Sequence, residues 1–250
     1  MTGKSKIKRI ALGNFEEKLL SYLEYKKLTF VSKNDLKTIN DKFVHATDLD
    51  DLIERMIKKN RLKSIIKGKY FVIPMRAINK KWAPTEVELI KYFMQDHKYY
   101  FGLSIAFNQH NFTDQIPIKV FIFNSKYSFD KTILNYRVKM IKIKKSRLFG
   151  FSNSIYPISD KERTIIDALE YPEYLGGLDT VIDILHNQKF NLKKLEEYVI
   201  KYKSIKIIKL VGLITNSNRL YKYLVKNKKL YYTTIKNSKI RDKKWKIRPI

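Results

Sequence analysis

The chain has 250 residues, of which 44% are apolar and 13% aromatic, so it can bury one large core or two modest ones. It contains no cysteine, which excludes disulfides, cysteine-based zinc sites and a thiol nucleophile. No apolar run reaches the roughly 18 residues of a membrane span, and the basic start, Met1–Arg9, is not followed by the apolar segment of a signal peptide. These features predict a cytoplasmic protein with no membrane partner.

Basic side chains dominate the charge: 52 Lys and Arg face 24 Asp and Glu, for a net charge of +28. Residues 1–82 carry 20 basic and nine acidic side chains, residues 83–186 carry 13 and 12, and residues 187–250 carry 19 and three. Two basic ends around a neutral middle indicate a polyanionic partner such as nucleic acid. A lysine-rich coding bias is the alternative origin, although such a bias would raise Glu as well, and acidic residues are scarce here.

Three amphipathic segments at the start of the chain predict helices. The first covers residues 14–27 with Asn14 as its N-cap, and the second, KNDLKTIN, has Ser32 as its N-cap. The third, LDDLIERMIKKN, is opened by Thr47 in a capping box with Asp50. Their predicted apolar faces consist of Phe15, Leu19, Leu20, Leu23, Leu36, Ile39, Leu49, Leu52, Ile53, Met56 and Ile57.

A β-hairpin is predicted next. The β-prone runs 62–66 and 70–73 flank the turn Lys67-Gly68-Lys69, where glycine supplies a positive φ, and Pro74 ends the second strand. Three helices followed by a hairpin form the order of a winged helix-turn-helix, whose third helix enters the major groove and whose wing touches the flanking backbone. The same order also occurs in protein-interaction modules. We therefore predict a DNA-binding domain over residues 1–74, followed by a polar linker over 75–83.

The remainder, residues 84–250, is predicted to be a larger mixed α/β domain. The predicted helices cover 84–95, 102–110, a segment opened by the capping box Ser159–Glu162 and stopped by Pro172, 178–187, 192–203, 205–215 and 219–227. The predicted strands cover 116–126, 138–143, 154–157, 230–235 and 245–247. The chain is thus predicted to be an α+β protein with two domains.

The sequence shows little catalytic chemistry. The four histidines are scattered with no i,i+4 pair, and no phosphate-binding glycine motif is present, so we predict no catalytic, metal or cofactor site. A nuclease would need converging carboxylates, for which Glu162 and Asp167 are the best candidates. Asp167 is more simply explained by an i,i+4 ion pair with Arg163. His110 is expected to be a buried, hydrogen-bonded residue that closes a helix.

Three runs in order carry a resemblance to a known family. They are I-x-K-G-K-Y-x-x-x-P at Ile65–Pro74, YYFGLSIAFNQHNFTDQIP at Tyr99–Pro117 and DKERTIIDALEYPEYLGG at Asp160–Gly177. Together they resemble the AbiE-type antitoxins of type IV toxin–antitoxin systems, known from abortive-infection phage defence. The resemblance extends from about residue 15 to the final WKI segment.

The resemblance implies a transcriptional autorepressor that is not an enzyme. In this family the winged helix binds inverted repeats in its own promoter, and the C-terminal domain counteracts a nucleotidyltransferase-like toxin without requiring a stable complex. The DNA-contacting elements carried over by position are the helix at Thr47–Lys59 and the wing at Arg61–Lys69. The predicted DNA-binding residues are Lys33, Thr47, Arg55, Lys58, Lys59, Arg61, Lys63, Lys67 and Lys69.

Acidic residues complicate this interface. Asp48, Asp50 and Asp51 begin the third helix and would repel phosphates, so base contacts are expected from Thr47, Arg55 or Lys58, with the other lysines on the backbone. Two other functions stay open: a winged-helix nuclease, and a basic nucleic-acid-binding or interaction module with no toxin partner.

Overall fold

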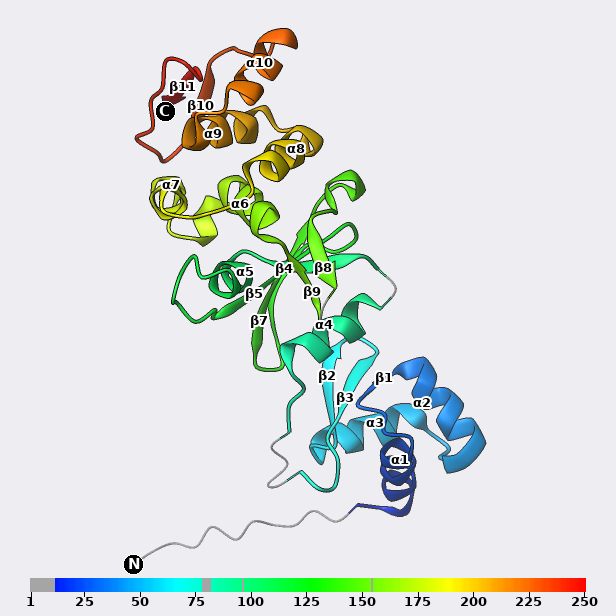
Figure 1. The fold of residues 1–250 in the computed structure, drawn as a ribbon. Helices are drawn as coiled ribbons and strands as arrows, with labels where there is room; N and C mark the ends of the chain where they lie inside the picture. Colours follow the sequence, from blue (N-terminus) through cyan, green and yellow to red (C-terminus); the bar gives the residue numbers. More distant parts are fainter. Residues whose placement is uncertain (1–11, 78–81, 96, 154) are drawn as a thin grey trace, which may run out of the picture. The chain divides into compact units, whose positions relative to one another are not determined.

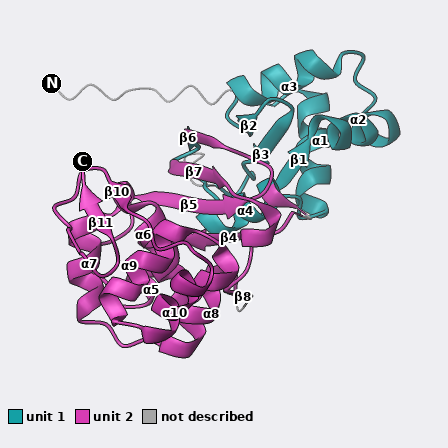
Figure 2. Cartoon of the chain, turned by 90° about the horizontal axis from the view of Figure 1, so that it is seen from above, with its two compact units in different colours: residues 1–93, 132–135 teal, residues 94–131, 136–250 magenta. Residues whose placement is uncertain are grey.

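The structure is a computed structural model that describes residues 12–77, 82–95, 97–153 and 155–250. The chain is a mixed α/β protein that divides into two compact units, residues 1–93 with 132–135 and residues 94–131 with 136–250 (Figure 2). We call them the N-terminal and the C-terminal unit. The division falls later than the predicted boundary at residue 84. The basic start, Met1–Arg9, and residues 78–81 of the predicted linker lie outside the described residues.

The N-terminal unit contains the three expected helices (Figure 1). They are α1 (Asn14–Tyr25), α2 (Lys33–Ile39) and α3 (Leu49–Lys58), with a π-helical turn, η1 (Asn40–Val44), after α2. Ser32 caps α2 as predicted, accepting a hydrogen bond from the Asp35 N–H. The predicted caps of the other two helices are wrong by one residue. Gly13 replaces Asn14, and Asp48 replaces Thr47, because the Asp48 carboxylate reaches the N–H groups of the first turn.

An antiparallel sheet completes this unit. Its strands are β1 (Phe30–Ser32), β2 (Leu62–Ile66) and β3 (Lys69–Val72), in the order β1-β3-β2. The predicted hairpin β2–β3 is confirmed, and Gly68 has the positive φ of +74° that its turn requires. The sequence did not predict β1, since three residues between two helices carry too little alternation. The core combines apolar residues of all three helices with Val31, Leu62 and Val72. Three residues of the predicted faces are not fully buried in it: Phe15 is exposed, and Leu49 and Ile57 are half-buried and pack against the core.

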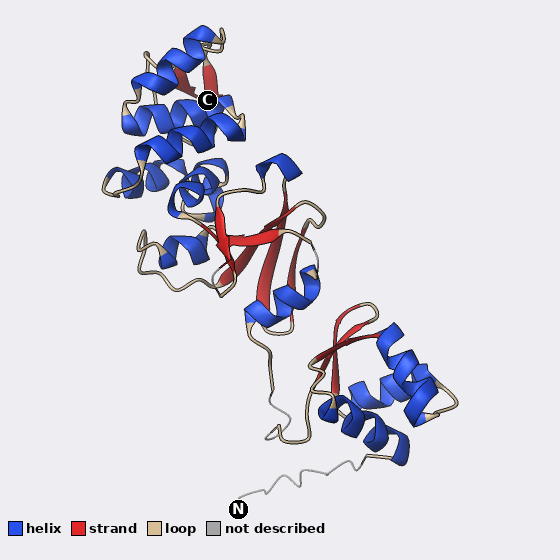
Figure 3. Ribbon diagram, turned by 45° about the vertical axis from the view of Figure 1, so that its right-hand side comes forward, coloured by secondary structure: helices blue, strands red, loops and turns tan. Residues whose placement is uncertain are grey.

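A six-stranded mixed sheet follows α4 (Glu86–Met94) in the chain (Figure 3). Its strands are β4 (Tyr99–Gly102), β5 (Lys119–Asn124), β6 (Phe129–Ile133), β7 (Tyr136–Lys142), β8 (Phe151–Asn153) and β9 (Pro157–Ser159), in the order β6-β7-β5-β4-β9-β8. The predicted helix from residue 102 begins two residues later, as α5 (Ser104–Gln109). The predicted strand 154–157 is wrong except at Pro157: β8 ends at Asn153 and its antiparallel partner β9 begins at Pro157. Residue 154 lies outside the described residues.

Helices fill the rest of the C-terminal unit. They are α6 (Lys161–Glu170), α7 (Leu178–His186), α8 (Leu192–Tyr202), α9 (Ile205–Thr215) and α10 (Asn218–Lys226), with short 3-10 turns η3 (Lys145–Arg147) and η4 (Pro172–Tyr174). The cap of α6 is Asp160, not the predicted Ser159. Two strands, β10 (Thr233–Ile235) and β11 (Ile247–Pro249), pair in parallel beside these helices. Among the described residues, no helix is long and apolar enough to cross a membrane.

A buried ion pair joins α6 to the sheet. The predicted Arg163–Asp167 pair forms, with 2.9 Å between Nη2 and Oδ1, but it is fully buried and not a helix-surface pair. The Tyr100 hydroxyl of β4 donates to Asp167 at 3.0 Å and accepts from Arg163 Nη2 at 2.6 Å. Arg163 also donates to the Arg147 carbonyl at 2.8 Å. The charged groups therefore satisfy one another where water cannot reach them.

The lysine at position 209 is buried on α9. Its Nζ donates to the Tyr231 carbonyl and, at 2.7 Å, to the Thr233 hydroxyl, which fixes the chain at the start of β10. Burial, aided by the nearby Lys246 charge, lowers the pKa of Lys209 to about 8.

This lowered pKa predicts a pH-dependent stability. Below pH 8 the folded and unfolded states both hold the proton, and between about pH 8 and 10.5 only the unfolded state does. The free energy of unfolding of the natural chain should therefore rise across this window, relative to Lys209→Met, by about 1–3 kcal/mol. Urea unfolding of both proteins between pH 7 and 10 measures the difference. Parallel pH curves would show that Lys209 keeps its ordinary pKa.

Candidate nucleic-acid interface

The nine predicted DNA-binding residues all belong to the N-terminal unit, on α2, α3, the segment before α3 and the β2–β3 hairpin. The structure brings part of this set together. The N–H of Lys33 donates to the Gly68 carbonyl at 2.8 Å, and Ser32 pairs with Lys69 between β1 and β3. These contacts place Lys33, Lys67 and Lys69 around the hairpin turn. We call these three residues the turn lysines.

The turn lysines differ in how free their charges are. Lys33 forms an ion pair with Asp50 at 2.6 Å, and the hydrogen bond to that carboxylate raises the pKa of Lys33. Lys67 is exposed, and Lys69 places its Nζ 5.2 Å from the centre of the Tyr92 ring. Neither Lys67 nor Lys69 lies within 4 Å of a carboxylate among the described residues. Both ammonium groups can therefore meet a phosphate without first breaking an ion pair.

The cations of α3 are paired instead. Lys58 is 71% exposed and contacts Glu54 at 2.6 Å, and its hydrogen bond to that carboxylate raises the pKa of Lys58. Arg55 contacts Asp51 at 2.5 Å and Glu16 of α1 at 3.1 Å. A base contact by Arg55 would have to replace these two carboxylates. The acidic first turn of α3 thus neutralises cations of its own unit.

Glu16 is a buried carboxylate that the sequence reading missed. It accepts from Lys59 at 3.0 Å and from the Gly13 N–H. Burial opposes its ionisation, but these hydrogen bonds and the charges of Lys59 and Arg55 outweigh burial and hold the pKa of Glu16 below its ordinary value. The pairing turns Lys59 inward, with only 17% of its side chain exposed. No local pattern signals it, since about 40 residues separate the partners.

Three predicted residues remain. Arg61 is 9% exposed and donates to the Pro74 carbonyl at 2.8 Å, so its guanidinium ties the hairpin to the following segment. Lys63 is half-buried on β2, opposite Phe71 of β3. Thr47 is exposed just before the cap of α3. We leave Lys59 and Arg61 out of the proposed interface because their side chains are occupied within the fold.

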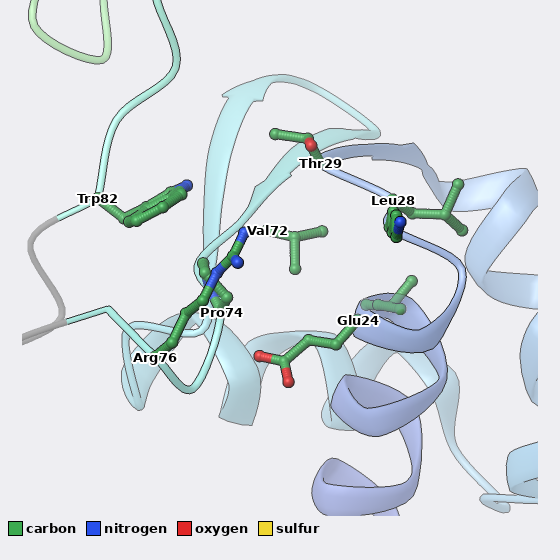
Figure 4. A pocket seen from close by; sticks show the side chains of 9 residues that line it. Glu24, Leu28, Thr29, Val72, Pro74, Arg76 and Trp82 are labelled. Atoms are coloured by element: carbon green, nitrogen blue, oxygen red, sulfur yellow. The ribbon is translucent and has the colours of Figure 1, made fainter.

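A pocket of about 470 Å³ lies in the same unit, between the end of α1 and the segment after β3 (Figure 4). Glu24 lines it together with Arg76, whose guanidinium lies 5.2 Å from the centre of the Trp82 ring. Glu24 also accepts a hydrogen bond from the Met75 N–H. Charges of both signs line this pocket, so it does not select a polyanion, and we do not count it with the interface.

The candidate nuclease carboxylates of the C-terminal unit are engaged elsewhere. Asp167 belongs to the buried pair with Arg163. Glu162 accepts from the Asn191 N–H at 2.9 Å and contacts Lys194 at 2.9 Å. Burial opposes its ionisation, but these partners outweigh burial and lower the pKa of Glu162. His110 ends α5, with Nε2 2.8 Å from the Ser159 carbonyl, which confirms the predicted helix end and hydrogen bond, but it is half-buried and not buried as predicted.

Comparisons with known proteins bear on the fold alone. No protein-family model matches the sequence, and no curated protein matches it. Among solved structures, the chain is similar to the crystal structure of the RV2827C protein from Mycobacterium tuberculosis, with a TM-score of 0.66 and 13% sequence identity. The match covers 96% of this chain and 92% of that one. The two chains therefore share an architecture over nearly their whole length.

Proposed function

We propose that the N-terminal unit is a winged helix that binds duplex DNA. The observation that carries the proposal is the order α1-β1-α2-α3-β2-β3, with β1 paired to β3, together with Lys67 and Lys69 of the hairpin, which have no carboxylate partner among the described residues. In such a domain the third helix reads the major groove and the hairpin contacts the backbone. Lys67 and Lys69 are then backbone contacts, and the exposed side chains beside the groove are Thr47 and Lys58, of which Lys58 must exchange Glu54 for the DNA.

We further propose that the chain is an autorepressor and the antitoxin of a type IV toxin–antitoxin pair. The support is the resemblance of three sequence runs to AbiE-type antitoxins, combined with a basic N-terminal unit that suits operator binding. Inverted repeats in the promoter of its own gene are the proposed DNA site, and a nucleotidyltransferase-like protein encoded nearby is the proposed toxin. On this proposal the chain acts by binding and has no catalytic centre.

A gel-shift titration on the region upstream of the gene tests the DNA-binding proposal. A shuffled duplex of the same length and composition serves as the competitor. A shift that persists under excess competitor supports operator recognition, and footprinting then locates the repeats. Equal affinity for both duplexes would overturn the repressor proposal. Co-expression with the neighbouring gene tests the antitoxin proposal separately, since growth should recover only when this chain is present.

The hairpin gives a variant-level prediction. Lys67→Ala/Lys69→Ala is expected to weaken binding to the operator and to the shuffled duplex alike, by about tenfold per lysine near 0.1 M salt, because phosphate contacts carry no sequence information. Fluorescence anisotropy with both duplexes measures this. The charge-matched control is Lys18→Ala/Lys26→Ala, which removes two exposed lysines, one on α1 and one at its C-cap. Equal losses in the two variants would contradict the assignment of the hairpin as the wing.

A further inference from the structure

The last quarter of the chain holds many cations that no carboxylate neutralises. Residues 187–250 carry 19 basic and three acidic side chains. Only Lys194 and Arg219 lie within 4 Å of a carboxylate among the described residues. Two of the three acids are engaged, since Glu196 pairs with Arg219 and the Asp242 carboxylate accepts from the Trp245 N–H at 2.7 Å. This contrasts with α3, where the cations are paired.

The two-stranded sheet β10–β11 displays part of this charge beside aromatic rings. Thr234 lies directly opposite Arg248 in the parallel register, so the two exposed side chains share one face. Because successive side chains of a strand point to opposite faces, Ile235 and Ile247 lie on the other, buried face. Tyr232 precedes Thr234 by two residues, and its ring centre lies 5.6 Å from Arg248 Cζ. Tyr231 lies beside this face, and its ring centre is 4.8 Å from the Nζ of buried Lys209. We call Tyr231, Tyr232, Thr234 and Arg248 the β10–β11 platform.

Both platform tyrosines are more than half exposed. Tyr231 is 55% exposed and Tyr232 is 54% exposed, although the hydrogen bonds from buried Lys209 hold the backbone of this segment in place. Large side chains that are fixed at the backbone and open at the ring can stack on a planar partner at a small entropic cost. Lysines flank the platform on both strands, at Lys236 and Lys246.

We infer that the β10–β11 platform binds single-stranded RNA, with unpaired bases stacked on Tyr231 and Tyr232 and phosphates held by Arg248 and the flanking lysines. Basic surfaces that carry exposed aromatic rings bind single strands in this way, because every base has a face that can stack. The bases of a duplex are already stacked and cannot reach these rings. The Thr234 hydroxyl beside them provides a hydrogen-bond partner for a ribose 2′-hydroxyl, which DNA lacks.

This site is distinct from the proposed duplex site in the N-terminal unit and does not depend on it. It uses other residues, another nucleic-acid form and another kind of contact. RNA binding also explains the excess of basic side chains in residues 187–250. Operator binding by α3 and the hairpin does not account for this excess.

The test compares full-length variants on a 20-nucleotide oligouridine RNA, its deoxyuridine counterpart and a 20-base-pair mixed-sequence DNA duplex. Tyr231→Ala/Tyr232→Ala should lose at least tenfold in affinity for oligouridine, and Tyr231→Phe/Tyr232→Phe should keep it, because phenylalanine still stacks. Duplex affinity should stay the same in both. Thr234→Val should remove the preference for RNA over deoxyuridine. Equal urea midpoints would show that the variants fold alike.

Three results would overturn the inference. The first is unchanged oligouridine affinity in the alanine variant. The second is an equal loss of oligouridine and duplex affinity, which would make the platform part of a general electrostatic surface. The third is equal affinity of the natural chain for oligouridine and oligodeoxyuridine, which would overturn the assignment to RNA.

Discussion

Replacing Asp167 by alanine is expected to lower the free energy of unfolding of the C-terminal unit by about 3–5 kcal/mol. The carboxylate lies in a site with no exposed surface, where it neutralises the Arg163 guanidinium and accepts from the Tyr100 hydroxyl. Removing it leaves a buried cation with only the Arg147 carbonyl and the tyrosine oxygen as acceptors. Urea unfolding followed by far-UV circular dichroism measures the loss.

Two control variants distinguish the stability effect of burying the charges from the effect of the ion pair itself. Glu54→Ala removes the carboxylate of another i,i+4 pair, Glu54–Lys58, whose side chains are both more than 60% exposed, and it should leave the urea midpoint unchanged. Arg163→Met/Asp167→Leu removes both buried charges and should recover much of the stability lost by Asp167→Ala. If Asp167→Ala unfolded no more easily than Glu54→Ala, the buried pair would not stabilise this unit.

The longer helices α1, α3, α6, α8 and α9 were predictable from the sequence because the spacing of apolar residues persists over ten residues or more. Their first residues were less predictable. Asn14, Thr47 and Ser159 were each expected as caps, and the structure uses Gly13, Asp48 and Asp160. In the last two cases neighbouring residues could both cap, and the backbone φ and ψ decide which side chain reaches the free N–H groups.

The short strands β1, β4 and β6 were not predicted, and the reason is physical. Three to five residues hold at most two periods of alternation, so the pattern is no stronger than chance. What makes Phe30–Ser32 a strand is pairing with β3, about 40 residues away. The run Tyr99–Gly102 is similarly defined by β5 and β9, its neighbours on either side.

In the candidate interface, too, local sequence patterns were predictable, whereas contacts between residues far apart in the sequence were not. The lysines of the hairpin could be predicted from the sequence, because lysines around a glycine turn are a local pattern. Which lysines lack a carboxylate partner could not be predicted. Glu16 of α1 forms ion pairs with Lys59 and Arg55, and the Pro74 carbonyl accepts a hydrogen bond from Arg61. Exposed Tyr231 and Tyr232 were expected only as part of a strand, since exposure of a ring depends on what packs around it.

Raising the salt concentration is expected to cause the largest change in affinity for the proposed duplex site. The logarithm of affinity should fall with the logarithm of salt concentration at a slope of about −0.9 for each phosphate contacted. Lys63, Lys67 and Lys69 have no carboxylate within 4 Å among the described residues. Three such contacts give a slope of about −2.7 and a loss of about 40-fold between 50 and 200 mM salt. If Lys33 and Lys58 also contacted phosphates, the slope would steepen to about −4.5 and the affinity loss would grow to about 500-fold.

The slope also identifies which lysines are used. Lys67→Ala/Lys69→Ala should make it shallower by about 1.8, since two phosphate contacts are lost, whereas Tyr231→Ala/Tyr232→Ala should leave it as it was. Anisotropy titrations of the operator duplex at four salt concentrations give the slope for each protein. A slope that the hairpin variant does not change would show that phosphates are bound elsewhere. A slope much steeper than −4.5 in the natural chain would show that cations beyond these five lysines also contact the duplex, either other exposed lysines of the N-terminal unit such as Lys18 and Lys26 or those of residues 187–250.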